Sequence, residues 1–346
     1  MNSTNQTESG LSTLDTIGFL LGFSTIAICG LFGNGFVIVS ICLDKKLRQA
    51  LMNKILVNLA VADLTNIVWC LPDIIHVCLS SWHLGLLMCK AARFLQIFSL
   101  YASVSLQVAV CLERFIAIRF PMRSRLLHGG RRVLIILSFI WVFAAVFASP
   151  YAIFHELKPY NKKFYCTAGE RLNYAYKFLQ FLVFYAIPAV VFLVLYGIIS
   201  RTLWKSNKGV LSEDQGSNMP ESLLKKRKAV IRTLVSCVLI YLFCYSPIQA
   251  IFLSSMLGSQ IRVPFRVGII FNAFTYLSAA ANPLLYVICM PTFRMKLIQC
   301  FKTPKRSATS DNLSCATPHQ TMALLGTPAK FPCRRSSDVS MSIYVT

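Results

Sequence analysis

Seven apolar segments, each long enough to cross a lipid bilayer as a helix, follow one another along this chain. They lie near residues 17–43, 53–79, 89–118, 133–154, 174–200, 229–257 and 265–289. About 20 apolar residues in helical conformation span the hydrocarbon core, and a helix satisfies its own backbone hydrogen bonds there. The sequence therefore predicts an all-α membrane protein built as a seven-transmembrane helix bundle.

Composition supports lipid as the solvent. Of 346 residues, 55% are hydrophobic and 14% are charged, whereas about a quarter of the residues of a soluble protein are charged. The net charge of +22 comes from basic residues in the short connections between apolar segments, not from one face of a folded domain, so no nucleic-acid partner is expected. The 13 cysteines and 5 histidines are not clustered at zinc spacing, and no bound metal of that kind is expected.

The placement of the basic residues predicts an orientation. Lys and Arg crowd the first, third and fifth connections and the stretch after the seventh segment, but none occurs in residues 1–16 or 80–88. By the positive-inside rule, the N-terminus is outside and the C-terminus is cytoplasmic, which fits a multi-pass protein of the plasma membrane. Two sequons, at Asn2 and Asn5, agree with this orientation and are expected glycosylation sites.

Four regions follow from this topology. Residues 1–16 form an extracellular N-terminus, residues 17–290 form the bundle, and residues 291–301 form a short amphipathic helix on the inner membrane surface. Cys300 in that helix is either a palmitoylation site or a plain structural cysteine. Residues 302–346 are rich in Ser, Thr and Pro and are expected to be a disordered tail, which kinases could phosphorylate to recruit arrestin.

Several polar side chains lie inside otherwise apolar segments. Asp63 is in the second segment, Asn34 in the first, Ser103 in the third, and Ser278 and Asn282 in the seventh. An ionisable group in the middle of a bilayer costs about 2.5–3.5 kcal/mol, so such residues need a reason to be there. Together they could form a hydrated cluster that holds Na⁺, or a hydrogen-bond network that only fixes helix packing.

The third segment carries a polar stripe. Residues at three- and four-residue steps share one face of a helix, and here they are Cys89, Arg93, Gln96, Leu100, Ser103, Gln107, Val110 and Arg114. Lipid would not tolerate this face, so the segment must be central in the bundle. At its end, Glu113 and Arg114 can neutralise each other, although a solvated interfacial pair is the simpler alternative.

A set of motifs, each on its own segment and in order, resembles the rhodopsin-like (class A) G-protein-coupled receptor family. The resemblance covers roughly residues 17–301, and its motifs are Gly33-Asn34, Asp63 in LAVAD, Glu113-Arg114-Phe115, Trp141, Pro188 with Tyr196, Cys244-Tyr245-Ser246-Pro247 and Asn282-Pro283-Leu284-Leu285-Tyr286. It implies a receptor that binds a ligand outside the cell and activates a heterotrimeric G protein inside.

The resemblance also implies roles for individual residues. Cys89 would form a disulfide with Cys166, while Trp82 and Gly85 would shape the first outer loop. The sodium site would consist of Asp63, Ser103, Ser278 and Asn282. The activation switch would involve Glu113, Arg114, Tyr196, Pro247, Asn282, Pro283 and Tyr286, with Arg114 held by Glu113 at rest and Pro247 as the kink about which span six swings.

Four positions depart from the usual family pattern. Phe115 replaces a Tyr, and Tyr245 replaces the Trp of the CWxP motif, which puts the aromatic switch under the ligand in doubt. Ser278 stands where many members have Asn, which would weaken the binding of a cation. Arg227 stands where some members have Glu, so a lock between Arg114 and span six is not expected.

The ligand class follows partly from what is missing. Span seven holds no Lys for a retinal Schiff base, and Gln96 stands where amine receptors carry an Asp. The expected mouth has one acid, one base and several amides and hydroxyls, namely Asp73, Arg93, Gln96, Tyr245, Gln249, Asn272 and Tyr276. That mixture favours a neuropeptide or peptide hormone, with a lipid or a small organic ligand as the alternative.

Other functional classes fit less well. A transporter or channel would be expected to show paired repeats with broken helices or a charged filter, and neither is apparent. No GxSxG, HExxH or phosphate-binding loop occurs, so the chain is not expected to be an enzyme, and no catalytic residue or organic cofactor is assigned. A scavenging receptor that does not signal would share every motif, and this possibility remains open.

Overall fold

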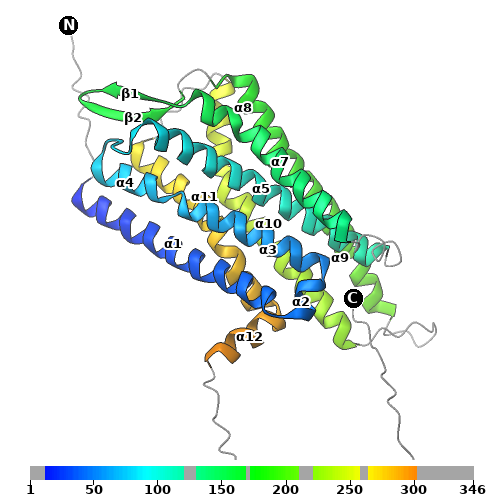
Figure 1. Ribbon diagram of the computed structural model, residues 1–346. Helices are drawn as coiled ribbons and strands as arrows, with labels where there is room; N and C mark the ends of the chain where they lie inside the picture. Colours follow the sequence, from blue (N-terminus) through cyan, green and yellow to red (C-terminus); the bar gives the residue numbers. More distant parts are fainter. Residues whose placement is uncertain (1–11, 121–129, 169–171, 210–220, 258–263, 302–346) are drawn as a thin grey trace, which may run out of the picture. The chain divides into compact units, whose positions relative to one another are not determined.

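The computed structural model describes residues 12–120, 130–168, 172–209, 221–257 and 264–301 (Figure 1). Within them, seven helical spans are long and apolar enough to cross a membrane, as the sequence predicts. The helices are α1 (Thr13–Cys42), α3 (Leu51–Val68) with α4 (Leu71–Leu79), α5 (Gly85–Arg119), α7 (Gly130–Phe154), α8 (Tyr174–Phe181) with α9 (Ile187–Gly209), α10 (Glu221–Met256) and α11 (Phe265–Cys289). A short helix, α12 (Pro291–Phe301), follows the last span.

The chain divides into two units, residues 1–299 and 300–346. The second unit is described only at Cys300 and Phe301, the last two residues of α12. The expected sequons at Asn2 and Asn5, the tail beyond residue 301 and the side chain of Cys300 lie outside the described residues.

Local chemistry explains where the spans begin and break. The first span starts at Thr13 because Ser12 and Asp15 form a capping box, in which each side chain pairs with the backbone N–H of the other. The second span breaks at Trp69 and Cys70, and Pro72 lies in the first turn of α4, which follows the break. The fifth span contains a π-helical turn, η2 (Leu182–Ala186), between α8 and α9.

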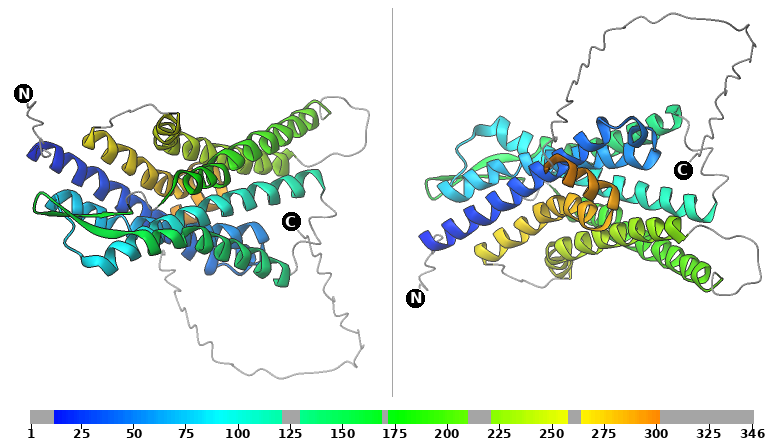
Figure 2. Two further views of the ribbon diagram at one scale, coloured as in Figure 1. Left: turned by 90° about the horizontal axis from the view of Figure 1, so that it is seen from above. Right: turned by 90° about the horizontal axis from the view of Figure 1, so that it is seen from below.

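The third span, α5, is central. It packs against α3, α7, α9 and α10 (Figure 2), and its polar stripe is buried or half-buried, with Gln96, Ser103 and Gln107 each less than 9% exposed. Large apolar side chains such as Phe32 on α1 and Phe139 on α7 are instead exposed. This inverted distribution is the one expected of a bundle whose outer surface faces lipid.

The first and seventh spans approach each other closely at a glycine. A Cβ added to Gly33 would lie 2.6 Å from Cγ of Pro283, and one added to Gly30 would lie 3.2 Å from Cβ of Ala280. The amide of Asn34 donates to the backbone carbonyl of Ala279 across the same contact (3.3 Å). Small residues therefore allow α1 and α11 to pack backbone against backbone.

A β-hairpin that the sequence analysis does not anticipate follows α7. Strand β1 (Glu156–Tyr160) pairs antiparallel with β2 (Lys163–Thr167), and Leu157 lies opposite Cys166. The two loop residues, Asn161 and Lys162, both have positive φ, as tight hairpin turns require. In Figure 1 the hairpin lies at one end of the bundle and α12 at the other. We call these the hairpin end and the α12 end.

Helix α12 contacts the preceding helices through an aromatic ring contact and an ion pair. Phe293 is 3% exposed and its ring lies 6.0 Å from that of Tyr286. The Nζ atom of Lys296 lies 2.9 Å from Asp44 Oδ2, and Asp44 also caps the short helix α2 (Lys45–Gln49). Of the apolar side chains of this helix, Phe293 is buried, whereas Ile298 is 41% exposed, as expected for a membrane-surface helix.

Candidate functional site

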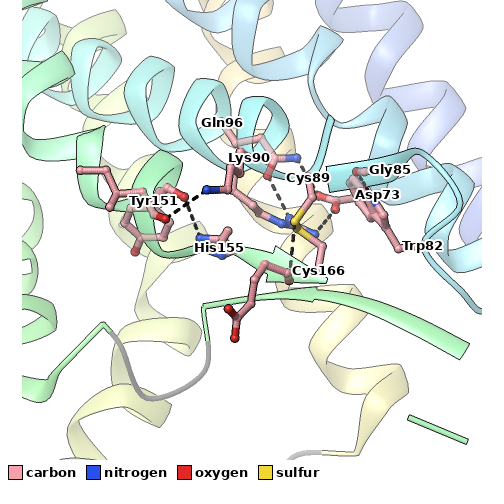
Figure 3. The surroundings of a disulfide bond; sticks show 12 residues. Asp73, Trp82, Gly85, Cys89, Lys90, Gln96, Tyr151, His155 and Cys166 are labelled. Carbon is pink, nitrogen blue, oxygen red and sulfur yellow. Dashed lines mark hydrogen bonds and ion pairs between the residues drawn. A yellow bond between two sulfur atoms is a disulfide. The ribbon is translucent and has the colours of Figure 1, made fainter. Parts of the chain in front are cut away.

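A disulfide ties the hairpin to the third span. Cys89, near the start of α5, is bonded to Cys166 on β2, with their Cα atoms 5.6 Å apart (Figure 3). The pairing implied by the family resemblance is therefore confirmed. It holds the second strand against the hairpin end of the central helix.

The connection between α4 and α5 is clamped to the same strand. The backbone N–H of Trp82 donates to the Phe164 carbonyl (2.8 Å), and the N–H of Phe164 donates to the Ser81 hydroxyl (3.0 Å). The indole N–H of Trp82 donates to the carbonyl of Gly85 (3.0 Å), which adopts a positive φ of 76°. Trp82 is 2% exposed, so the loop and the hairpin form one fixed rim.

Beneath this rim the bundle contains a cavity of about 580 Å³. All seven residues expected at the ligand mouth line it: Asp73, Arg93, Gln96, Tyr245, Gln249, Asn272 and Tyr276. They come from α4, α5, α10 and α11, and Cys166 and Thr167 of β2 add the rim. The structure thus brings together four spans that are far apart in the sequence. We call this space the main cavity.

A polar network fixes one wall of the main cavity. Asp73 Oδ1 lies 2.8 Å from Arg93 Nη2, while Asp73 Oδ2 accepts hydrogen bonds from the Tyr276 hydroxyl (2.7 Å) and the Gln96 amide (2.8 Å). Arg93 also donates to Gln96 Oε1 (3.0 Å). Because the acid and the base neutralise each other, this wall offers a pre-arranged polar surface without a net charge.

Further polar residues line the main cavity besides the seven that were predicted, among them Tyr151, His155, Lys177 and Gln180. The hydroxyl of Tyr151 donates to Gln180 Oε1 (3.1 Å). All four lie near the ends of their helices, where polar residues are common. Position in the sequence alone therefore carries no signal for them.

His155 follows the end of α7 and is 7% exposed. Its Nδ1 lies 2.9 Å from the carbonyl of Tyr151. Burial, and then the charge of Arg93, lower the pKa of His155 to about 4, so the ring is neutral at physiological pH. Since a carbonyl can only accept, Nδ1 carries the proton and Nε2 is left as an acceptor.

Deeper in the bundle, Asp63 is 1% exposed and accepts hydrogen bonds from Ser103 and Asn282, each at 2.8 Å. Within the described residues no Lys, Arg or His forms an ion pair with it. Ser278 is buried one turn before Asn282 on α11. Small hard cations are bound by oxygen ligands such as a carboxylate without a basic partner and nearby hydroxyl groups. The chemistry of these residues therefore fits Na⁺. Among the described residues no cluster of His, Cys, Asp and Glu suits another metal.

At the α12 end of α5, Glu113 and Arg114 form the expected pair. Arg114 Nη2 lies 2.7 Å from Glu113 Oε1, and Nε makes a second contact with Oε2. Tyr196 and Tyr286 are both buried nearby and line one small cavity. The side chain of Arg227 lies outside the described residues, so the absence of a lock to span six stays a prediction.

Span six is joined to the π-helical turn of span five next to its proline. The Tyr185 and Ser246 hydroxyls lie 2.6 Å apart, directly before Pro247. Tyr245, which replaces the usual Trp, is 5% exposed; its ring lies 4.8 Å from that of Tyr241, and its hydroxyl lies 3.4 Å from the Thr275 carbonyl. A tyrosine here keeps an aromatic side chain beneath the main cavity and adds a polar contact to α11.

Comparison with known proteins decides the family. The sequence model of the seven-transmembrane receptors of the rhodopsin family matches residues 33–286, which is more than two thirds of the chain. The chain belongs to the rhodopsin family of seven-transmembrane receptors. This receptor is therefore a multi-pass membrane protein and not an enzyme.

Its relatives share most of its length. The receptor is 34% identical to neuropeptide receptor 15 of Caenorhabditis elegans, over 81% of its own chain and 89% of the relative. It is 28% identical to the KiSS-1 receptor of Mus musculus, over 92% and 84%. It is 26% identical to galanin receptor 2a of Danio rerio, over 90% and 85%.

Proposed function

We propose that this receptor binds a neuropeptide or peptide hormone in the main cavity and activates a heterotrimeric G protein at the α12 end. The observation that carries the proposal is the convergence of Asp73, Arg93, Gln96 and Tyr276 on one polar wall beneath a disulfide-fixed rim. The relatives are named as peptide receptors, which supports the same class of ligand.

The chemistry of the main cavity suits a peptide. Amides such as Gln249 and Asn272 can pair with the alternating donors and acceptors of a peptide backbone. The paired Asp73 leaves no uncompensated acid for an amine ligand. A small organic or lipid ligand would leave many of these polar groups unpaired, so it is the weaker alternative.

The experiment is nucleotide exchange on a panel of G proteins, using membranes of cells that express the receptor and synthetic galanin and kisspeptin peptides as probes. We expect at least one probe to stimulate exchange. In Gln96→Leu, the potency of that probe in the exchange assay should fall at least tenfold. Gly35→Ala, on an open face of α1, is the matched control and should respond as the wild type does. Specific binding and uptake of a probe without exchange would instead favour the scavenging receptor.

We further propose that the hairpin end faces the outside of the plasma membrane and that Asn2 and Asn5 are glycosylated. The excess of Lys and Arg in the first, third and fifth connections supports this orientation. Glycosidase treatment should lower the apparent molecular mass of the wild type on a gel, but not that of a variant lacking both asparagines. Resistance of the wild type to glycosidase would remove this support.

Three regulatory features complete the proposal. Na⁺ would be held by Asp63, Ser103, Ser278 and Asn282, and it would favour the state in which these groups are close together. On the inner surface, palmitate on Cys300 would anchor α12 to lipid, and phosphorylation of the Ser-rich tail by receptor kinases would recruit arrestin. The exposed side chain of Ile298 on α12 supports a membrane-surface position for this helix.

A further inference from the structure

Gln107 lies on the buried face of α5, between two polar sites described above. It follows Ser103, the partner of Asp63, by one helical turn and precedes Arg114 by two, which places it about 6 Å and about 10 Å from them along the helix axis. The side chain is 6% exposed. Its carbonyl oxygen, Oε1, is buried and has no hydrogen-bond partner in the described part of the chain.

Gln107 lines a small cavity where five helices meet. The cavity measures about 10 Å³ and lies between α3, α5, α9, α10 and α11. Most of its lining is apolar, including Leu59, Val110, Leu234 and Val238. Its lining also includes Cys237 of α10 and two tyrosines, Tyr196 of α9 and Tyr286 of α11.

The unpaired oxygen makes the described packing less stable than it would be with an apolar side chain. A buried acceptor without a partner loses its hydrogen bonds to water and gains none in return. The cavity is at the lower limit of size for a single water. Among the lining side chains the strong donors are the hydroxyls of Tyr196 and Tyr286, whereas the Cys237 thiol is only a weak donor.

We infer that Gln107 is a positioning residue that gives this receptor ligand-independent signalling. In the state in which Arg114 is paired with Glu113, the Gln107 carbonyl is unpaired; when the α12 end opens, it accepts a hydrogen bond from Tyr196 or Tyr286. The free-energy gap between the two states is thereby narrowed, so the signalling state is populated without ligand. This inference rests on the proposed G-protein coupling and adds the regulation of that coupling.

The test is ligand-free nucleotide exchange at matched surface expression, with Arg114→Ala as the baseline without coupling. We expect Gln107→Leu and Gln107→Met to lower ligand-free exchange five- to tenfold toward that baseline; tenfold corresponds to about 1.4 kcal/mol. Gln107→Glu keeps an acceptor of the same length and should keep exchange at or above the wild-type level. Ser99→Ala is the matched control, because Ser99 is also fully buried on α5 but bonds to its own helix at Leu95 (2.7 Å).

The outcomes separate this inference from the proposed function. Wild-type exchange no higher than that of Arg114→Ala, or equal exchange in Gln107→Leu and wild type, overturns the inference. A rise in the melting temperature of Gln107→Leu with unchanged exchange also overturns it, because the residue would then be merely structural. If the ligand-free differences are found but no peptide probe stimulates exchange, the role of Gln107 stands and the peptide proposal fails.

Discussion

Asp73 and Arg93 form an ion pair across one wall of the main cavity, with Oδ1 and Nη2 2.8 Å apart. Their side chains are 11% and 21% exposed. Both charges are therefore largely removed from water, and each compensates the other. The remaining carboxylate oxygen is used by Tyr276 and Gln96. The pair therefore holds α4, α5 and α11 in one arrangement before any ligand arrives.

Removing either partner should leave the other partly buried and uncompensated. We expect Asp73→Asn and Arg93→Gln each to destabilise the receptor by about 2 kcal/mol, in the range for hydrogen bonds to charged groups. The double variant should lose clearly less stability than the sum of the two single losses, because residues in direct contact are energetically coupled. Thermal unfolding of all four proteins in one detergent measures this; strictly additive losses would mean that the pair contributes nothing.

The close approach of α1 and α11 at Gly33 should tolerate no side chain. In Gly33→Ala the new Cβ would lie 2.6 Å from Pro283, so we expect a loss of about 1–3 kcal/mol from overpacking. Gly35→Ala is the matched control, since a Cβ there meets nothing within 4 Å. Thermal unfolding of both variants is the measurement, and equal stability of the two would show that the contact is not tight.

His155 should make stability depend on pH. Burial and Arg93 lower its pKa to about 4 from 6.5, so between these values the unfolded chain binds a proton that the folded receptor does not. The contribution of His155 to the free energy of unfolding is constant above about pH 6.5, and this free energy falls as the pH drops from there toward 4. We expect the wild type to lose more thermal stability between pH 7.5 and 5 than His155→Gln does. Equal losses in both proteins would exclude His155 as the cause.

The buried Asp63 should make ligand-free exchange sensitive to sodium. We expect Na⁺, but not an equal concentration of K⁺, to lower exchange in the wild type, because the cation binds the state in which Asp63 and Ser103 are together. Asp63→Asn removes the charge and should abolish the difference between the salts. Persistence of the sodium effect in that variant would place the cation elsewhere.

The spans were predictable from the sequence because lipid imposes a simple requirement on length and polarity. The β-hairpin was not, because its strands are short and its position depends on contacts with distant residues, namely the Cys89–Cys166 bond and the backbone of Trp82. The π-helical turn after Phe181 was likewise missed, since nothing in the apolar run LVFYA distinguishes it from an ordinary helix.

Some residues of the site could be predicted from the sequence and others could not. Residues in the middle of spans, such as Asp63 and Gln96, stand out because a polar side chain there needs a partner. Lys177 and Gln180 do not stand out near the start of span five, and only the folded bundle shows that they line the main cavity. Gln107 lay on the predicted polar stripe, but its lack of a partner is visible only in the structure.

In the proposed function, the polar interior connects ligand binding at the hairpin end to G-protein activation at the α12 end, and Arg114 is released from Glu113 as the final step. The most direct test is nucleotide exchange by Arg114→Ala with a stimulating peptide, alongside peptide binding to the same membranes. We predict near-complete loss of exchange with binding and surface expression largely unchanged. Full exchange by Arg114→Ala would contradict the account.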